Sequence, residues 1–266
     1  MGVDCSAAGF IDALCEVART AGARTMDYFG HDAGVSFKDD QSPLTLADTA
    51  SDEVICAALA RLHPDTPVIS EEAAAKAAID VDGEFFLVDP LDGTKEFIQN
   101  RTDFTVNIAL IRGGVPVAGV VYAPALDALY AGTEGAGSRM CEGPGGSWRP
   151  IRIRACPADG LITAVASKSH NTPETDDYLA RFAVGERVSV GSSLKFCLVA
   201  AGRADLYPRI APTYEWDTAA GDAVLRSAGG SVLGLDGRPL LYGKPRFWNP
   251  GFVACGDLKA PAAQSA

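Results

Sequence analysis

Two aspartates three residues apart are the sharpest chemical feature of this 266-residue chain. Asp89 and Asp92 belong to the segment DPLDGT at residues 89–94, which follows the apolar run FFLV. Pro90 fixes φ and forbids helical continuation, so both carboxylates can bend toward one point together with the Leu91 carbonyl oxygen. Oxygen ligands of this kind suit Mg²⁺ or Mn²⁺ better than zinc. The segment predicts a hard-cation site, although an ordinary capped turn uses the same residue types.

The residues that follow Asp92 are suited to a phosphate group. Gly93 lets the backbone approach a ligand closely. A helix is expected from Lys95 to Gln99, and the free N–H groups at its start can receive a phosphate. Cation and phosphate would then meet at the same turn.

Two further acidic positions can complete the site. Glu71 follows a strand expected over 66–70, so the same sheet edge can present it beside Asp89. Asp217 lies at the start of an apolar helix expected over 216–228. Each acid alone is also typical of a helix cap or first turn. Together, four carboxylates at element ends can hold two divalent ions about 4 Å apart, the arrangement used for in-line phosphoryl displacement.

Phosphatases with an aspartate nucleophile are the main alternative chemistry, because they too carry acids, Gly and Thr after an apolar strand. Their Asp-x-Asp spacing places nucleophile and acid on one face of the strand. Asp89 and Asp92 are separated by two residues instead. Attack by a metal-activated water is therefore the preferred interpretation.

The first half of the chain is predicted to be an α+β unit that positions these acids. A helix is expected over 6–29, and a second one begins at Thr45 or Asp48 and stops at His63 and Pro64. Short apolar runs between turn residues predict strands over 66–70, 85–88, 104–111, 115–122 and 127–133. The last three suit an antiparallel meander.

From about residue 150 the pattern alternates between strands and helices, which indicates an α/β half. Strands are expected over 150–154, 161–166, 187–190, 204–207, 231–235 and 252–255. Helices are expected over 173–183, 194–201 and 216–228. Gly and Pro near residue 145 mark a seam, so we predict an N-terminal half at 1–145 with most of the metal ligands and a C-terminal half at 146–266. The fold class is α/β.

The charge balance of the chain is acidic, with 23 Lys and Arg against 34 Asp and Glu, a net charge of −11. Nucleic acids and anionic membrane surfaces require a basic face, so we expect no nucleic-acid partner. The seven cysteines form no CxxC or CxC pair, which argues against a disulfide framework and a thiolate zinc site. This cysteine usage favours a reducing compartment.

We expect neither an export signal nor a transmembrane segment. Asp4, Asp12 and Glu16 stand where a secretory signal would carry basic residues and then an apolar stretch. The longest apolar region, 113–131, is interrupted by two prolines and Asp127. The protein is predicted to be cytoplasmic, either free or peripheral at the cytoplasmic face of the inner membrane.

Motifs spread from about residue 10 to 254 give the chain a specific resemblance to a known family. They are SPLTLAD (42–48), VISEE (68–72), LVDPLDGTKEF (87–97), FTVNIAL (104–110), GVVYAP (119–124), GSSLKFCLVA (191–200), LYPR (206–209) and WDTAAG (216–221). The chain resembles the lithium-sensitive phosphatases of the inositol monophosphatase superfamily, and within it the CysQ-type 3'(2'),5'-bisphosphate nucleotidases. The resemblance implies a layered α/β/α/β/α sandwich and Mg²⁺ dependence with inhibition by Li⁺ and Ca²⁺. It also implies hydrolysis of 3'-phosphoadenosine 5'-phosphate (PAP) to AMP and phosphate, which recycles a by-product of sulfur assimilation.

The resemblance assigns the metal ligands position by position. Glu71, Asp89 and the Leu91 carbonyl would hold one Mg²⁺, and Asp89, Asp92 and Asp217 would hold the second. A third, weaker ion is implied near Glu71.

The resemblance also implies a catalytic pair. Thr94, in contact with Asp48, would orient and deprotonate the attacking water, whose pKa the metal lowers. The phosphate would rest on the N–H groups of Gly93 and Thr94.

Substrate recognition involves further residues. The TKEF that follows DGT is the nucleotidase-like form of this motif. His170, Ser192, Lys195 and Arg209 are expected to bind the second phosphate and the nucleoside, since lysine and arginine donate to a dianion. The residues expected to contact substrate at the metal centre are Glu71, Leu91, Asp92, Gly93, Thr94 and Asp217.

Three alternatives stay open at this level. An inositol monophosphatase or a broader sugar-phosphate phosphatase would use the same metal core, because that core recognises a phosphate ester rather than its alcohol. A metal-dependent nucleotide sensor would have no need of the pair Thr94 and Asp48, which disfavours it. Both a monomer and a homodimer are compatible with the sequence.

Overall fold

The outer helical layer of the fold is formed by α1 (Phe10–Met26) and α2 (Leu46–Leu62). Apolar residues at helical spacing, such as Leu14, bury one face of α1 against the neighbouring sheet. The helix is shorter than the predicted range 6–29. The predicted start of the second helix is confirmed, because Thr45 caps α2 through a capping box.

The first sheet has seven strands in the order β3-β4-β5-β6-β7-β8-β9. The β3 and β4 strands pair in parallel and all other neighbours pair antiparallel, which confirms the predicted meander. The strands are β3 (Val68–Ser70), β4 (Glu84–Asp92), β5 (Thr105–Arg112), β6 (Val115–Ala123), β7 (Ala128–Thr133), β8 (Gly137–Glu142) and β9 (Arg149–Ile151).

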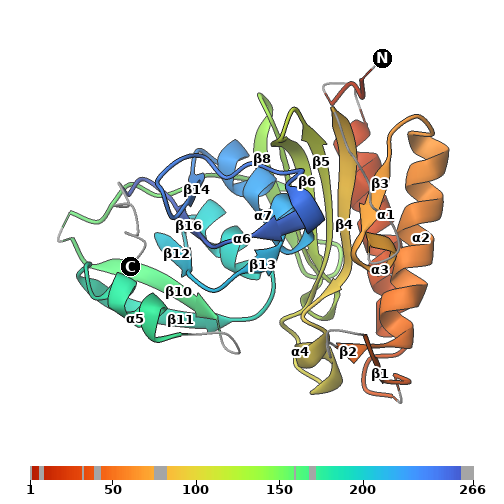
Figure 1. The fold of residues 1–266 in the computed structure, drawn as a ribbon, viewed down its shortest axis with the longest axis horizontal. Coiled ribbons are helices and arrows are strands. Elements are labelled where there is room, and N and C mark those ends of the chain that lie inside the picture. Colours follow the sequence, from red (N-terminus) through yellow and green to blue (C-terminus); the bar gives the residue numbers. More distant parts are fainter. Residues whose placement is uncertain are drawn as a thin grey trace.

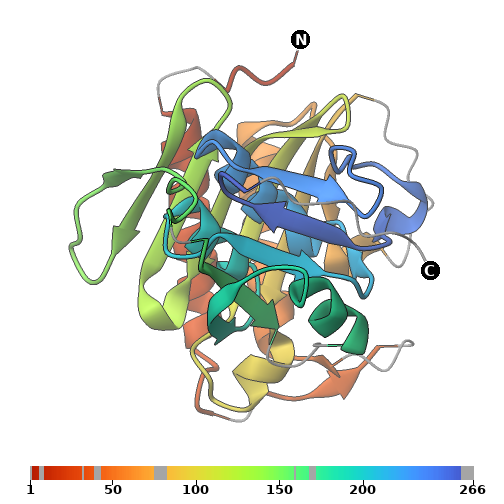
Figure 2. The same cartoon turned by 90° about the vertical axis from the view of Figure 1, so that its left-hand side faces the viewer.

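The second sheet has five strands in the order β11-β10-β12-β16-β14, and it is mixed rather than wholly parallel. Figure 2 shows it facing the viewer, with the α5 helix on its outer side. Its elements are β10 (Ile162–Ser167), α5 (Pro173–Leu179), β11 (Val184–Val190), β12 (Leu206–Arg209), β14 (Ser231–Gly234) and β16 (Phe252–Cys255).

Two helices lie between the sheets and complete a layered α/β/α/β/α sandwich, as predicted (Figure 1). They are α6 (Leu194–Ala200) and α7 (Trp216–Ser227). The shorter elements are β1 (Ser36–Phe37), β2 (Pro43–Leu44), α3 (Glu71–Ala74), α4 (Thr94–Ile98), β13 (Thr213–Tyr214), β15 (Trp248–Asn249) and the 3₁₀ turns η1 (Pro124–Leu126) and η2 (Pro245–Phe247). The structure describes residues 2–5, 9–31, 33–38, 43–74, 83–158, 160–167 and 172–258.

One buried cluster extends across the predicted boundary at residue 145. The strand predicted over 150–154 is only β9, and it pairs with β8 in the first sheet rather than with the second half. The same cluster joins Phe85 and Tyr130 of the first sheet to Phe196 and Phe252 of the C-terminal half. The division into 1–145 and 146–266 stays a prediction.

Close backbone packing places the α7 helix on the first sheet. At Gly119 in β6, a Cβ atom would lie 2.6 Å from the Ala220 carbonyl oxygen and 2.7 Å from the Ala223 Cβ. Glycine therefore permits the helix to approach the strand, and this approach positions Asp217 at the N-terminal end of α7. In the part of the chain that the structure describes, no helix is long and apolar enough to cross a membrane.

Candidate active site

The sequence predicted a strand that ends at residue 88, before the aspartates. In the structure, the β4 strand continues through Pro90 to Asp92. Asp89 pairs with Asn107 of β5 and Asp92 pairs with Thr105, so three steps along β4 match two along β5. This extra residue is a β-bulge, where proline is tolerated because one ladder hydrogen bond is already lost. The bulge turns the DPLD segment without ending the strand.

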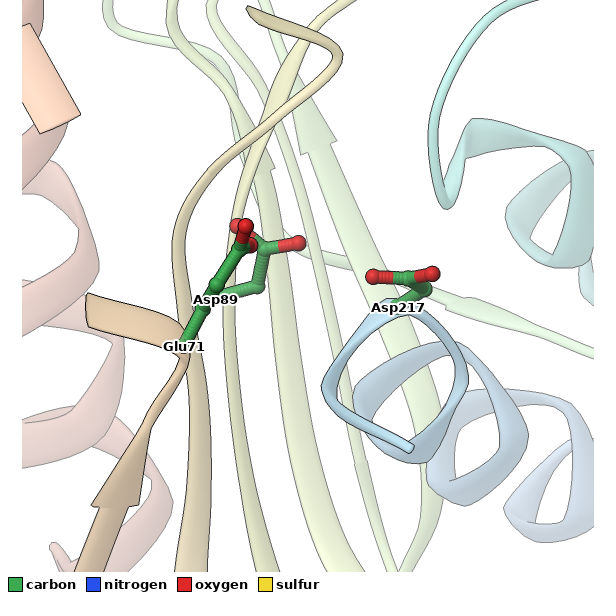
Figure 3. Close-up of side chains that lie close together, drawn as sticks. All are labelled: Glu71, Asp89 and Asp217. Atoms are coloured by element: carbon green, nitrogen blue, oxygen red, sulfur yellow. The ribbon is translucent and has the colours of Figure 1, made fainter. Parts of the chain in front are cut away.

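Glu71, Asp89 and Asp217 converge from three elements. Each offers one carboxylate oxygen, and these oxygens all lie within 4.8 Å of one another (Figure 3). The parallel pairing of Ser70 with Val88 brings the next residues, Glu71 and Asp89, side by side. The α7 helix supplies Asp217 from the opposite side. The structure thus brings together acids that the sequence predicted to meet.

Asp92 is fixed by hydrogen bonds next to this cluster. Its Oδ2 lies 3.0 Å from the Ser193 hydroxyl and 3.3 Å from the donor Asn107 Nδ2. Its backbone neighbour Leu91 is buried, and the Leu91 carbonyl lies 3.2 Å from the Thr94 hydroxyl. Ser193 and Asn107 were not predicted from the sequence. The position of Asn107 opposite Asp89 follows from strand pairing, which a single sequence does not specify.

The acids raise one another's pKa. Burial, followed by the charges of neighbouring carboxylates, holds the pKa values of Asp89 and Asp217 well above their usual range. Burial also raises the pKa of Glu71 to about 7, although Lys38 Nζ lies 2.6 Å from Glu71 Oε1 and opposes this shift. The same ammonium lies 2.9 Å from Glu72. Lys38 was missed from the sequence because it comes from a separate segment.

The donor set fits a hard divalent cation. Its ligand atoms are carboxylate oxygens, Leu91 lines the same cavity, and among the described residues the group contains neither sulfur nor imidazole. Crowded, buried carboxylates are unfavourable when ionised, so a bound cation would relieve their mutual repulsion. The residues that could hold a metal are Glu71, Asp89, Leu91, Asp92 and Asp217.

A hydroxyl and a carboxylate from distant segments meet beside this cluster. Thr94 Oγ1, at the start of α4, lies 3.2 Å from Asp48 Oδ1. The other oxygen of Asp48 accepts hydrogen bonds from the N–H and the hydroxyl of Thr45, at 2.8 and 2.6 Å. Gly93 immediately precedes α4 with φ 95°, where glycine is favoured. In this geometry, Asp48 can accept a proton that the Thr94 hydroxyl passes on.

A cavity of about 370 Å³ extends from the acids to a cationic wall formed by Lys195 and Arg209. Ten of the predicted residues line it: Glu71, Asp89, Leu91, Asp92, Gly93, Thr94, Ser192, Lys195, Arg209 and Asp217. Asp48 lies behind this lining and accepts a hydrogen bond from Thr94. His170 lies outside the described residues.

The cationic wall is built around α6. Lys195 is buried, and its Nζ donates to the Ser192 carbonyl at 2.5 Å. Burial lowers the pKa of Lys195 to about 8, and the nearby charge of Asp92 opposes this shift. Arg209 donates from Nε to the Ala211 carbonyl at 3.2 Å. The described residues place no hydrogen-bond partner next to the buried hydroxyl of Ser192, so this hydroxyl is available to a ligand.

A sequence model of the inositol monophosphatase family matches residues 7–262. The chain belongs to this family. It is 45% identical over 248 residues to the 3'(2'),5'-bisphosphate nucleotidase CysQ of Escherichia coli K12, covering 91% of this chain and 98% of that protein. It is 40% identical to the CysQ of Buchnera aphidicola, with 92% of each chain covered.

Solved structures of family members have the same fold. CysQ from Bacteroides thetaiotaomicron superposes with a TM-score of 0.78 at 38% identity, covering 94% of this chain and 99% of that chain. An inositol monophosphatase from Anabaena superposes with a TM-score of 0.74 at 27% identity, covering 93% and 91%. In this chain, the acidic cluster and the cationic wall line one cavity.

Proposed function

We propose that this family member is a Mg²⁺-dependent 3'(2'),5'-bisphosphate nucleotidase that hydrolyses PAP to AMP and phosphate. The main support for this proposal is that the acidic cluster shares its cavity with Lys195 and Arg209, two cations suited to a second phosphate. The CysQ relatives, at 40–45% identity over almost their whole length, bear the name of this activity. Such an enzyme would recycle a by-product of sulfur assimilation.

Two Mg²⁺ ions would be held by the acids, with a weaker third near Glu71. Glu71, Asp89 and the Leu91 carbonyl would hold one ion. Asp89 would also contribute to the second ion, together with Asp92 and Asp217. Bound Mg²⁺ would lower the pKa of the attacking water and offset the negative charge of the phosphate. Without cations, these carboxylates would repel an anionic substrate.

Asp48 and Thr94 would handle the proton of the attacking water. The Thr94 hydroxyl can donate to Asp48 Oδ1, which lies 3.2 Å away, and accept the water's proton in turn. Asp48 is 2% exposed, so bulk water does not compete for this carboxylate. The N–H groups of Gly93 and Thr94 would bind the scissile phosphate.

Lys195, Arg209 and the unpartnered Ser192 hydroxyl would bind the phosphate that is not cleaved. A substrate with one phosphate would make no phosphate contact with Lys195 and Arg209, which favours bisphosphates. His170 is part of the same proposal. We further propose that the enzyme acts in the cytoplasm as a monomer or homodimer, either free or peripheral at the inner membrane.

A substrate panel at one Mg²⁺ concentration tests this function. We expect kcat/KM to be highest for PAP and lower for inositol 1-phosphate and fructose 1,6-bisphosphate. We expect Li⁺ and Ca²⁺ to inhibit the reaction and EDTA to abolish it. A higher kcat/KM for inositol 1-phosphate would instead assign the chain to the inositol monophosphatases, and binding of PAP without phosphate release would indicate a sensor.

A further inference from the structure

An aromatic pair stands at the mouth of the proposed active site. Tyr214 and Trp248 line the same cavity as Asp217 and Arg209. Trp248 is 43% exposed, whereas the neighbouring aromatic Phe247 is 6% exposed. A large apolar ring left partly exposed beside the charged groups of this cavity favours a ligand that has an apolar face as well as charge.

The fold holds this pair rigidly. The β13 and β15 strands pair Tyr214 with Trp248, and the two ring centroids lie 5.0 Å apart at 80°. Tyr214 also stacks on Trp216, with centroids 4.7 Å apart at 12°. The buried Asn249 ties the two strands through Nδ2, which donates to the Tyr214 carbonyl at 3.2 Å. A ligand would therefore bind to a preformed surface, and little conformational entropy of these side chains would be lost on binding.

Backbone strain directly before Trp248 also indicates a ligand-binding site. Arg246 and Phe247 have φ values of 60° and 54°, a left-handed conformation that non-glycine residues rarely adopt. The turn buries Phe247 against Phe85 and Trp216 and leaves the next side chain at the cavity mouth. Such strain persists where the surroundings impose it, and it concentrates at ligand-binding sites.

We propose that the indole of Trp248, braced by Tyr214, is the stacking surface for the nucleobase of the substrate. This inference rests on the proposed nucleotidase function and adds a residue for base recognition. The cavity would then hold the scissile phosphate at the acids, the second phosphate at Lys195 and Arg209, and the base at its aromatic mouth. Stacking requires only a flat ring, so purine and pyrimidine nucleoside bisphosphates are both predicted substrates.

Steady-state kinetics on Trp248→Ala and Trp248→Phe test the stacking surface. We expect Trp248→Ala to raise the KM for PAP by on the order of 10-fold or more, while kcat changes little. The KM for inositol 1-phosphate, which has no base, should rise much less. Trp248→Phe should recover most of the affinity for PAP. An unchanged KM for PAP, or an equal rise for both substrates, would overturn the proposal.

Tryptophan fluorescence provides a second readout that does not require turnover. Titration with AMP and Mg²⁺ should quench the emission of the wild-type protein, whereas inositol 1-phosphate should not. Trp148→Phe is the matched control, because Trp148 packs against Arg139 and is not among the residues that line the cavity. Quenching should survive in this control and be much weaker in Trp248→Phe, where Trp216, the remaining tryptophan near the cavity, is buried. Quenching as strong in Trp248→Phe as in the wild type would contradict the assignment.

The two proposals fail in different ways. A wild-type protein that hydrolyses inositol 1-phosphate but no nucleotide would remove the proposed function. A wild-type protein that prefers PAP, with an unchanged preference in Trp248→Ala, would remove only the stacking surface.

Discussion

The hydroxyl of Thr94 lies 3.2 Å from Oδ1 of Asp48, a residue 46 positions earlier in the chain. The second oxygen of Asp48 closes the capping box of α2 with Thr45. One carboxylate therefore fixes the start of a helix and faces the proposed attacking water. Because the cap holds the carboxylate in place, little reorientation is needed during catalysis.

Asp48→Asn should separate these two roles. The amide oxygen of asparagine can still accept the hydrogen bond from the Thr45 N–H, but it cannot accept a proton, so we expect kcat to fall by roughly 10²- to 10⁴-fold. The free energy of unfolding should change by less than about 1 kcal/mol. Thr45→Ala is the control, and it should lose about 1 kcal/mol of stability with a far smaller loss of kcat. Full activity in Asp48→Asn would exclude Asp48 as the proton acceptor.

Asp217→Asn should weaken metal binding without unfolding the protein. Burial, followed by the charges of the neighbouring acids, raises the pKa of Asp217, so its ionised form is unfavourable in the metal-free protein and a neutral amide avoids this cost. We expect Tm without Mg²⁺ to be at least that of the wild type, and the rise in Tm on adding Mg²⁺ to be smaller. Phosphate release should collapse. Asp176→Asn, at an exposed acid paired with Arg187, is the control and should behave like the wild type in both assays.

The activity toward bisphosphates should fall above about pH 8. Burial lowers the pKa of Lys195 to about 8, so the ammonium is charged below that pH and neutral above it. A neutral Lys195 cannot pair with the second phosphate, so the ratio of kcat/KM for PAP to that for inositol 1-phosphate should decline as the pH rises. Measuring this ratio from pH 6.5 to 9.5 cancels effects common to both substrates.

Lys195→Gln provides the comparison for this pH profile. Its ratio should be low at every pH and should not change between pH 7 and 9. A decline in Lys195→Gln as steep as in the wild type would assign the effect to another group.

Gly119→Ala should destabilise the protein and disturb the site at a distance. A Cβ atom at residue 119 would lie 2.6 Å from the Ala220 carbonyl, so α7 would have to move away from β6. We expect a loss of about 1–3 kcal/mol in the free energy of unfolding, measured by chemical denaturation. Because Asp217 lies on α7, the KM for Mg²⁺ should rise as well.

Gly256→Ala is the matched control for this substitution. Its added Cβ would lie 3.5 Å from the nearest atom, an ordinary contact with Ile153. Stability and the KM for Mg²⁺ should both stay close to those of the wild type. Equal losses in the two variants would show that close packing at Gly119 is not the cause.

Local patterns were sufficient to predict much of the fold. The capping residue Thr45 and the meander after residue 104 depend on short-range backbone preferences and on the alternation of buried residues, which a sequence displays directly. Pairing between elements was less predictable. The strand near residue 150 was placed in the second half, but hydrogen bonds to β8 put it in the first sheet.

The family, the layered fold and the acidic residues of the candidate site were predictable from the sequence, because motifs such as DPLDGT and WDTAAG need residue types at set spacings. The pairing of Lys38 with Glu71 and the position of Trp248 at the cavity mouth could be seen only in the folded chain. Both facts depend on contacts between distant segments. Local propensity carries no information about such partners, since they are selected by packing across the whole chain.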